Sequence, residues 1–165
     1  MHLHLILILN PVFCFLGAAG TDFIWNNEKR LGQYQSAWNS MNKPSKSIYY
    51  QTKATSLMTI SGGSPGNAYK CWSVRYTDLN PATETGMRNY YCALASTMAV
   101  YFAKEPVKTV PTLNYTEKNG VEYVYNKAGD RGTDPVIFTD GKTCDLFSVP
   151  RLDTGEGCEL WVNSE

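Results

Sequence analysis

The sequence predicts a single domain built almost entirely of β-strands, a sandwich or a barrel, with one helix before the first strand. One stretch of the 165-residue chain, residues 27–42, has apolar residues at helical spacing. Eight short stretches after it show the two-residue alternation of strands, and turn sequences rich in Gly, Pro and Asn separate them. Short strands at regular spacing are typical of all-β sandwiches and barrels.

The first twenty residues have the features of a secretory signal peptide. A mostly apolar run over residues 3–16 is followed by four small residues. An uncleaved membrane anchor is the alternative, but Asn10-Pro11 interrupts the run and a spanning helix needs about 20 apolar residues. We therefore expect a signal peptide at 1–20, a mature domain at 21–165 and a secreted, extracellular protein.

The helix and the strands follow from two different periods. Leu31, Tyr34, Trp38 and Met41 recur every three or four residues, which predicts an amphipathic helix over residues 27–42. After this segment the period changes to two. The predicted strands span residues 47–56, 68–77, 87–95, 98–115, 121–125, 133–138, 144–149 and 158–162.

Two details of the strand pattern bear on the architecture. Trp72, Val74 and Tyr76 fall on one face of the second strand, because side chains alternate along a strand. Pro106 and Pro111 interrupt the fourth, which suits an edge strand or a bent one. The turn sequences that separate the strands are residues 61–66, Asn119-Gly120, Asp140-Gly141 and residues 154–157.

Composition excludes several classes of function. The chain has 15 basic and 15 acidic residues, so it lacks the basic surface expected of a nucleic-acid or membrane partner. Its two histidines, His2 and His4, lie in the predicted signal peptide. The mature domain therefore has no histidine for a catalytic triad, a general base or a metal site. No motif indicates a catalytic pair of carboxylates, so we expect a protein that is not an enzyme and that has no cofactor or metal.

In a secreted protein, cysteines can form disulfides and an asparagine in a suitable triplet can be glycosylated. The mature domain has four cysteines: Cys71, Cys92, Cys144 and Cys158. An even number in a secreted chain predicts disulfides, and three connectivities are possible. The triplet Asn114-Tyr115-Thr116 is an acceptor for N-glycosylation at Asn114.

The most specific motif lies near the end of the chain. Cys144-Asp145-Leu146 is followed, after twelve residues, by Glu159-Leu160-Trp161. Ala37-Trp38, Tyr49-Tyr50, Lys53-Ala54-Thr55 and Cys71 precede this motif in order. Together they resemble the tick salivary lipocalins, the group that includes the histamine-binding proteins.

The resemblance implies an eight-stranded antiparallel lipocalin-type barrel, with Trp38 packed at one end. It also implies a monomeric, secreted salivary protein that sequesters a host biogenic amine, histamine or serotonin, and so suppresses host defence. Similar proteins continue into a C-terminal helix with further cysteines. The chain ends at Glu165, so we expect a C-terminally truncated barrel without that helix.

The resemblance further implies particular site residues and one disulfide. The expected ligand-binding residues are Glu159, Trp161, Glu105, Tyr125, Asp134 and Asp145. Their plainer interpretation is structural, with Trp161 in the core and Asp145 at a turn or strand edge. Similar proteins pair the cysteines matching Cys71 and Cys144 with cysteines of the C-terminal segment, which leaves Cys92 and Cys158 to each other.

The chain lacks some of the acidic residues of the family pattern, so ligands other than amines are also possible. Residues 29–77 contain no Asp or Glu but several Lys and Arg, so half of the expected acidic cage is missing. A single amine site around Glu159 is compatible with this pattern. The alternatives are an acidic lipid mediator, a leukotriene or fatty acid, held by basic residues at the barrel mouth, and a host protein bound by the outer surface.

Overall fold

The protein is an eight-stranded barrel. A computed structural model describes residues 23–44, 46–55, 68–124, 129–152 and 155–163. The predicted signal peptide, the turn at 61–66 and Tyr125 lie outside the described residues.

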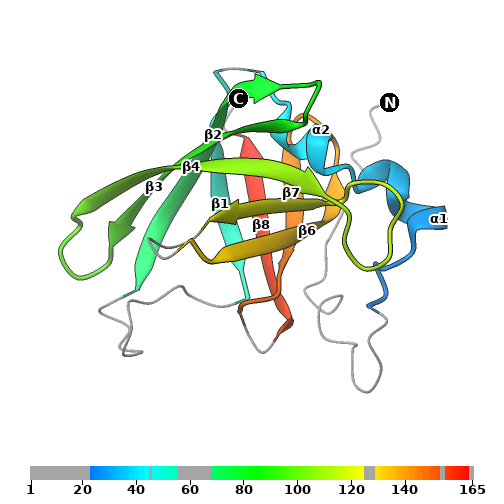
Figure 1. The fold of residues 1–165 in the computed structure, drawn as a ribbon. Coiled ribbons are helices and arrows are strands. Elements are labelled where there is room, and N and C mark those ends of the chain that lie inside the picture. Colours follow the sequence, from blue (N-terminus) through cyan, green and yellow to red (C-terminus); the bar gives the residue numbers. More distant parts are fainter. Residues whose placement is uncertain (1–22, 45, 56–67, 125–128, 153–154, 164–165) are drawn as a thin grey trace, which may run out of the picture.

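Eight antiparallel strands close into one barrel, in which each strand pairs with the next and the last pairs with the first (Figure 1). The strands are β1 (Tyr49–Ala54), β2 (Tyr69–Asn80), β3 (Thr85–Leu94), β4 (Val100–Val110), β5 (Gly120–Val124), β6 (Arg131–Thr139), β7 (Cys144–Val149) and β8 (Gly157–Asn163). The structure confirms the eight-stranded antiparallel barrel and excludes the sandwich. Closure pairs each of the eight described strands with a neighbour on both sides.

The helical region before β1 is confirmed but is divided into three short segments: α1 (Glu28–Leu31), a 3-10 turn η2 (Gly32–Tyr34) and α2 (Ala37–Met41). The predicted single helix over residues 27–42 was wrong in its continuity because a second helix start lies inside it. The Ser36 hydroxyl accepts a hydrogen bond from the Asn39 N–H at 3.2 Å, as an N-cap does. The chain therefore changes direction before α2.

The second helix closes one end of the barrel. Figure 1 shows α1 and α2 together at one side of the strands, and α2 packs against β4 and β6. Ala37 and Met41 of α2 are fully buried in the main apolar core with Val107, Val136 and other valines. Trp38 packs against the same core, as predicted. Burying this apolar face is what holds such a short helix in place.

The connection from β4 to β5 differs from the prediction. β4 ends at Val110, earlier than expected, and the backbone turns at Leu113 and Asn114, both of which have positive φ. Asn119 is buried there and its side-chain oxygen accepts hydrogen bonds from Thr112. The turn expected at Asn119-Gly120 is therefore wrong. The turn expected at Asp140-Gly141 is confirmed, because the Asp140 carboxylate accepts three backbone N–H groups there.

The cysteines do not form the predicted bridge. Within the described residues Cys92 is a buried free thiol, and Cys71 and Cys144 are also free thiols. Cys92 lies two residues from Tyr90, and Cys158 lies next to Glu159; both Tyr90 and Glu159 face the barrel interior. Because side chains alternate, Cys92 points inward and Cys158 points to the other face. The two sulfur atoms are thus on opposite sides of the barrel wall, which corrects the expected Cys92–Cys158 pair.

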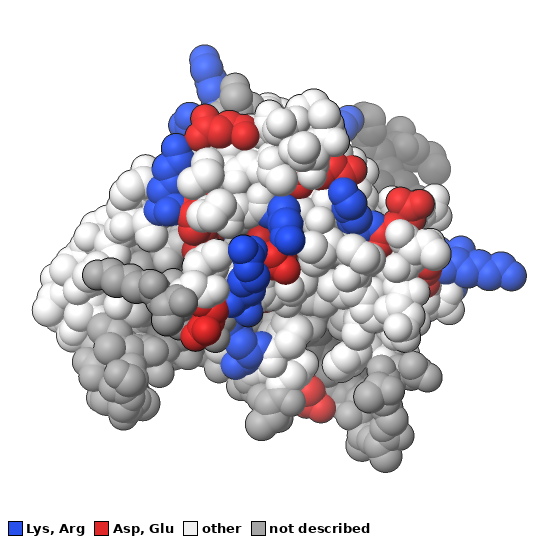
Figure 2. Space-filling view, in the orientation of Figure 1, with Lys and Arg blue, Asp and Glu red and all other residues white. Residues whose placement is uncertain are grey.

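The outer surface carries both signs of charge. Figure 2 shows Lys and Arg interspersed with Asp and Glu over the face in view. Several of these residues form exposed ion pairs, such as Lys104 with Asp78 and Arg131 with Glu122. Among the described residues, the helices are all too short to cross a membrane.

Candidate functional site

The barrel encloses a cavity of about 160 Å³. That is close to the roughly 150 Å³ of an engineered protein cavity that holds one benzene molecule. Its lining is mainly aromatic and charged: Tyr49, Gln51, Trp72, Val74, Tyr76, Arg88, Tyr90, Glu105, Tyr123, Asp134, Asp145, Phe147, Arg151, Glu159 and Trp161. Phe147 and Tyr123 also belong to the apolar core, so the cavity lies directly beside the core that α2 closes.

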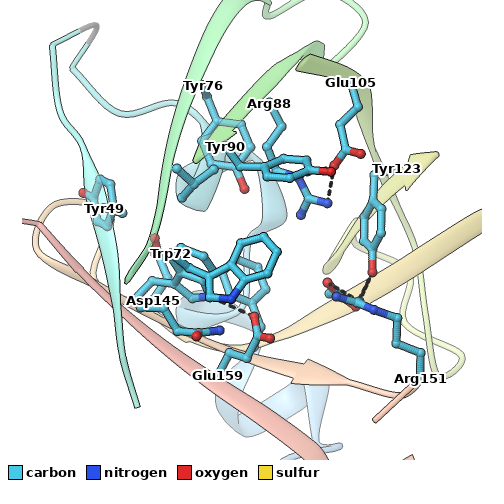
Figure 3. Close-up of a pocket in the computed structure, with 15 residues that line it drawn as sticks. Tyr49, Trp72, Tyr76, Arg88, Tyr90, Glu105, Tyr123, Asp145, Arg151 and Glu159 are labelled. Atoms are coloured by element: carbon cyan, nitrogen blue, oxygen red, sulfur yellow. Dashed lines mark hydrogen bonds and ion pairs between the residues drawn. The ribbon is translucent and has the colours of Figure 1, made fainter. Parts of the chain in front are cut away.

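Strand alternation positions these side chains. Trp72, Val74 and Tyr76 of β2 point inward together, as their shared face predicted. Glu159 and Trp161 of β8 do the same, because they are two residues apart on one strand. Each strand therefore contributes every second residue to the wall, and residues far apart in sequence face one another across the cavity (Figure 3).

Four carboxylates lie in this wall, and all four are buried. The exposed fractions are 7% for Glu105, 6% for Asp134, 3% for Asp145 and 5% for Glu159. Burial of a charge in a protein is unfavourable unless a partner compensates it. The partners of each carboxylate therefore decide what the cavity can bind.

Glu105 is neutralised by Arg88. The Arg88 Nε donates to the Glu105 Oε1 at 2.5 Å, and the two side chains also form an ion pair (Figure 3). They stand opposite each other on β3 and β4, where Arg88 and Glu105 are register partners. The Arg88 guanidinium lies 4.0 Å from the centroid of the Tyr123 ring, a cation–π contact that holds it in place.

Asp134 is neutralised by Arg151. The Arg151 Nη1 lies 3.1 and 3.3 Å from the two Asp134 carboxylate oxygens. The Tyr123 hydroxyl donates to the same carboxylate at 3.0 Å and accepts from Arg151. Tyr123 thus contacts two arginines: its ring lies against Arg88, and its hydroxyl is hydrogen-bonded to both Arg151 and Asp134.

Asp145 is neutralised by Lys43. The Lys43 Nζ lies 3.0 Å from the Asp145 Oδ1, and the Thr139 hydroxyl donates to the same oxygen at 2.5 Å. Burial raises the pKa of Asp145 to about 6, although Lys43 and Thr139 oppose the shift. Lys43 also lies over the Tyr49 ring, 5.0 Å from its centroid. This network joins the segment after α2 to the start of β7.

Glu159 differs from the other three carboxylates. Within the described part of the chain it forms no ion pair, and its hydrogen-bond partner is the Trp161 indole, whose Nε1 donates to Oε2 at 3.1 Å. Burial raises the pKa of Glu159, and the nearby negative charge of Asp134 adds to the shift, while Arg151 opposes it. Glu159 is therefore the cavity acid without a committed counter-ion.

Aromatic rings form much of the remaining wall. Trp72 and Tyr90 line the cavity with their ring centroids 5.7 Å apart. The Tyr69 ring packs edge-to-face against both Trp72 and Tyr101. Tyr101 is 44% exposed, so this row of rings extends from the cavity wall to the surface. Ring faces of this kind attract cations and stack on planar groups.

The structure brings together five of the six residues expected to bind a ligand. Glu159, Trp161, Glu105, Asp134 and Asp145 all line the cavity. Tyr125 lies outside the described residues. Asn114, the expected glycosylation site, is exposed in the turn between β4 and β5.

Sequence reasoning missed the three cations that pair with these acids. Arg88 could have been found, because it lies two residues before Tyr90 on a predicted strand and so shares its face. Lys43 and Arg151 lie outside regular elements, after α2 and in the turn after β7. Local periodicity carries no signal for residues in such positions.

The chain is similar to a known protein family, to a curated protein and to a solved structure. Residues 25–165 match the family described as tick histamine binding protein. The chain is 29% identical over 169 residues to a male-specific histamine-binding salivary protein of Rhipicephalus appendiculatus, covering 98% of this chain and 78% of that one. It also resembles the crystal structure of an AM182 serotonin complex, with a TM-score of 0.49 and 24% identity over 78% of this chain and 70% of that chain. The family match spans the whole barrel with the helical segment before it, so the chain belongs to the tick histamine-binding protein family.

Proposed function

We propose that this protein binds one singly charged biogenic amine inside its barrel. The observation that supports the proposal is the charge balance of the cavity. Of the four buried carboxylates, three have their own cation and Glu159 has none within the described residues. A ligand with one ammonium group supplies the missing positive charge.

The position of Glu159 suits such a ligand. An ammonium group that leaves water needs a counter-charge, because desolvation is otherwise not compensated. Glu159 offers a carboxylate, and the rings of Trp161, Trp72 and Tyr90 offer planar surfaces beside it. The cavity volume of about 160 Å³ fits one small ring with a short side chain. Histamine has this form, and serotonin carries the same ethylamine side chain on an indole of two fused rings.

The same charge balance disfavours the lipid alternative. The carboxylate of a leukotriene or fatty acid requires a cation that is free to receive it. Arg88, Arg151 and Lys43 are each already paired with a cavity acid. An anionic ligand would therefore have to displace a buried carboxylate, whose own charge would then be uncompensated.

The biological role follows from stoichiometric binding. A secreted protein of this kind removes a free mediator by mass action and has no catalytic step. The relative from Rhipicephalus appendiculatus is named as a histamine-binding salivary protein. We infer that this chain is likewise secreted and that it sequesters a host amine, which suppresses the host response to that amine.

Titration calorimetry of the secreted protein with histamine, serotonin and a leukotriene tests the proposal. We expect one amine bound per chain and no leukotriene binding. Glu159→Gln keeps the shape of the side chain and removes its charge, so amine affinity should fall at least about tenfold, as expected for a charge-assisted hydrogen bond. Glu117→Gln, at an exposed position outside the cavity, is the matched control and should leave affinity unchanged. Tighter binding of the leukotriene than of either amine would refute the proposal.

A further inference from the structure

We propose that Arg151 determines the charge of the ligand that this cavity accepts, because by neutralising Asp134 it restricts the site to one positive charge. The inference rests on the amine-binding function proposed above and adds a specificity-determining residue to it. It predicts that the cavity prefers a monoamine over a diamine, and that replacement of Arg151 shifts this preference toward the diamine.

Arg151 differs from the other two cations in its place in the fold. It lies in the turn directly after β7, whereas Arg88 lies within β3 and is paired on both sides. The Arg151 side chain is 30% exposed, compared with 18% for Arg88 and 3% for Lys43. Arg151 is therefore the most solvent-accessible of the three cations.

Arg151 and Asp134 form a direct ion pair. Its Nη1 contacts both carboxylate oxygens, and its guanidinium lies 5.3 Å from the centroid of the Tyr123 ring. Tyr123 is only 1% exposed and donates its own hydroxyl hydrogen to Asp134. The buried tyrosine thus fixes both partners, and the negative charge of Asp134 is compensated before any ligand enters.

Asp134 and Glu159 line one cavity. Whether the negative charge of Asp134 is neutralised therefore affects which ligand Glu159 can bind. Asp134, Glu159 and Arg151 all line the same space, and Figure 3 shows Arg151 and Glu159 in it. Burial raises the pKa of Glu159, the negative charge of Asp134 adds to this shift, and the positive charge of Arg151 opposes it. Among the described residues, one cavity carboxylate is uncompensated when Arg151 is present and two are uncompensated without it.

The number of uncompensated carboxylates sets the preferred ligand charge. In the natural protein the second ammonium of a diamine would be desolvated without a counter-charge, which is unfavourable. In a protein without Arg151 a diamine would satisfy both acids, whereas a monoamine would leave Asp134 buried and unpaired. The ratio of monoamine affinity to diamine affinity therefore depends on whether Arg151 neutralises Asp134.

Two probes with the same aromatic ring separate these cases: 4-methylbenzylamine, which has one ammonium group, and para-xylylenediamine, which has two. Calorimetry near neutral pH should show that the natural protein prefers the monoamine by at least about tenfold. Arg151→Gln should shift the ratio of affinities at least about tenfold toward the diamine. Arg151→Lys retains the positive charge and should retain the preference for the monoamine.

A charge-cancelling pair of variants keeps the inference testable if Arg151→Gln does not fold. Asp134→Asn alone removes the negative charge that offsets Arg151 in the cavity, so the Arg151 charge opposes a bound ammonium and monoamine affinity should fall at least about tenfold. Asp134→Asn with Arg151→Gln removes both charges, leaves Glu159 uncompensated again and should restore the monoamine preference. A purely structural role for Arg151 would not produce this recovery.

The outcomes distinguish the two proposals. If the natural protein binds the monoamine but Arg151→Gln has the same preference, Arg151 does not set the ligand charge, and the amine-binding function stands. Failure of the double variant to recover monoamine binding would overturn the inference in the same way. If the natural protein binds neither probe, nor histamine or serotonin, both proposals are wrong.

Discussion

The indole of Trp161 donates a hydrogen bond to the carboxylate of Glu159 at 3.1 Å, from a position two residues further along the same strand. Both side chains point into the barrel because side chains alternate on a strand. The bond orients the one cavity acid without a cation partner among the described residues. Trp161 therefore has two separable features: a ring that packs against a ligand and an N–H group that holds the acid.

Substitutions at Trp161 should separate these two features. Trp161→Phe keeps an aromatic ring and removes the donor, whereas Trp161→Ala removes both. Because the hydrogen bond lowers the pKa of Glu159, Trp161→Phe should raise that pKa further and weaken amine binding at neutral pH. The loss should be smaller than for Trp161→Ala, and calorimetry with serotonin measures both. Equal losses in the two variants would show that the ring contributes nothing.

Amine binding should weaken at acidic pH, and at a higher pH than an exposed glutamate would cause. Burial raises the pKa of Glu159 above its ordinary 4.5. The ligand needs the ionised form, so affinity is full above the pKa of the free protein and falls about tenfold per pH unit below it. Serotonin is the suitable probe, because its ammonium resembles that of lysine, with a pKa of roughly 10.

Affinity measured between about pH 8 and pH 4 locates this transition. Its midpoint should lie above 4.5, the ordinary value for a glutamate. Glu159→Gln should bind weakly and lose most of the dependence on pH. A midpoint at or below the ordinary value would contradict the assigned role of Glu159.

Loss of Lys43 should destabilise the fold strongly, because Asp145 would remain buried without a counter-ion. Breaking such a buried pair costs about 3–5 kcal/mol of the free energy of unfolding, and both side chains are at most 4% exposed. Lys43→Met should show this loss in chemical denaturation at neutral pH. Lys104→Met, which breaks the exposed pair with Asp78, is the matched control and should change stability by less than about 1 kcal/mol.

The loss in Lys43→Met should also depend on pH. The folded-state pKa of Asp145 is about 6, above its ordinary 3.8, and Lys43 holds it down. Without Lys43 the pKa rises further, so the folded variant binds a proton more readily than the unfolded chain. Protonation then favours the folded state, and the difference from the natural protein should be smaller at pH 5 than at pH 8. An equal difference at both values would contradict the burial of an unpaired Asp145.

Gly132 should be required for the position of Tyr123. A Cβ atom at Gly132 would lie 2.8 Å from the Tyr123 Cζ and from its hydroxyl, closer than packed atoms tolerate. Gly132→Ala should displace the ring, lower stability by about 1–3 kcal/mol and weaken amine binding. A double-mutant cycle with Tyr123→Leu, which removes the ring and its hydroxyl, measures the coupling. Strict additivity of the two losses would show that the contact is not the cause.

Strand positions were predictable because they depend on local spacing. The stretch predicted as residues 144–149 coincides with β7, and the inward face of Trp72, Val74 and Tyr76 was visible as an alternation. The helical region shows the limit of this reasoning. Its apolar period is continuous over residues 27–42, but the cap at Ser36 divides it, because a local hydrogen bond competes with helix propagation.

By itself, the sequence determined the order of the strands, the faces that their side chains share, and the acids that enter the barrel. The tertiary structure decided which charges compensate one another. Lys43 and Asp145 are 102 residues apart, and their pairing depends on the packing of the segment after α2 against β7. The energies of buried charges depend on distance and burial in space rather than on separation along the chain. For this reason Glu159 can be identified only in the closed barrel as the cavity acid that has no cation partner among the described residues.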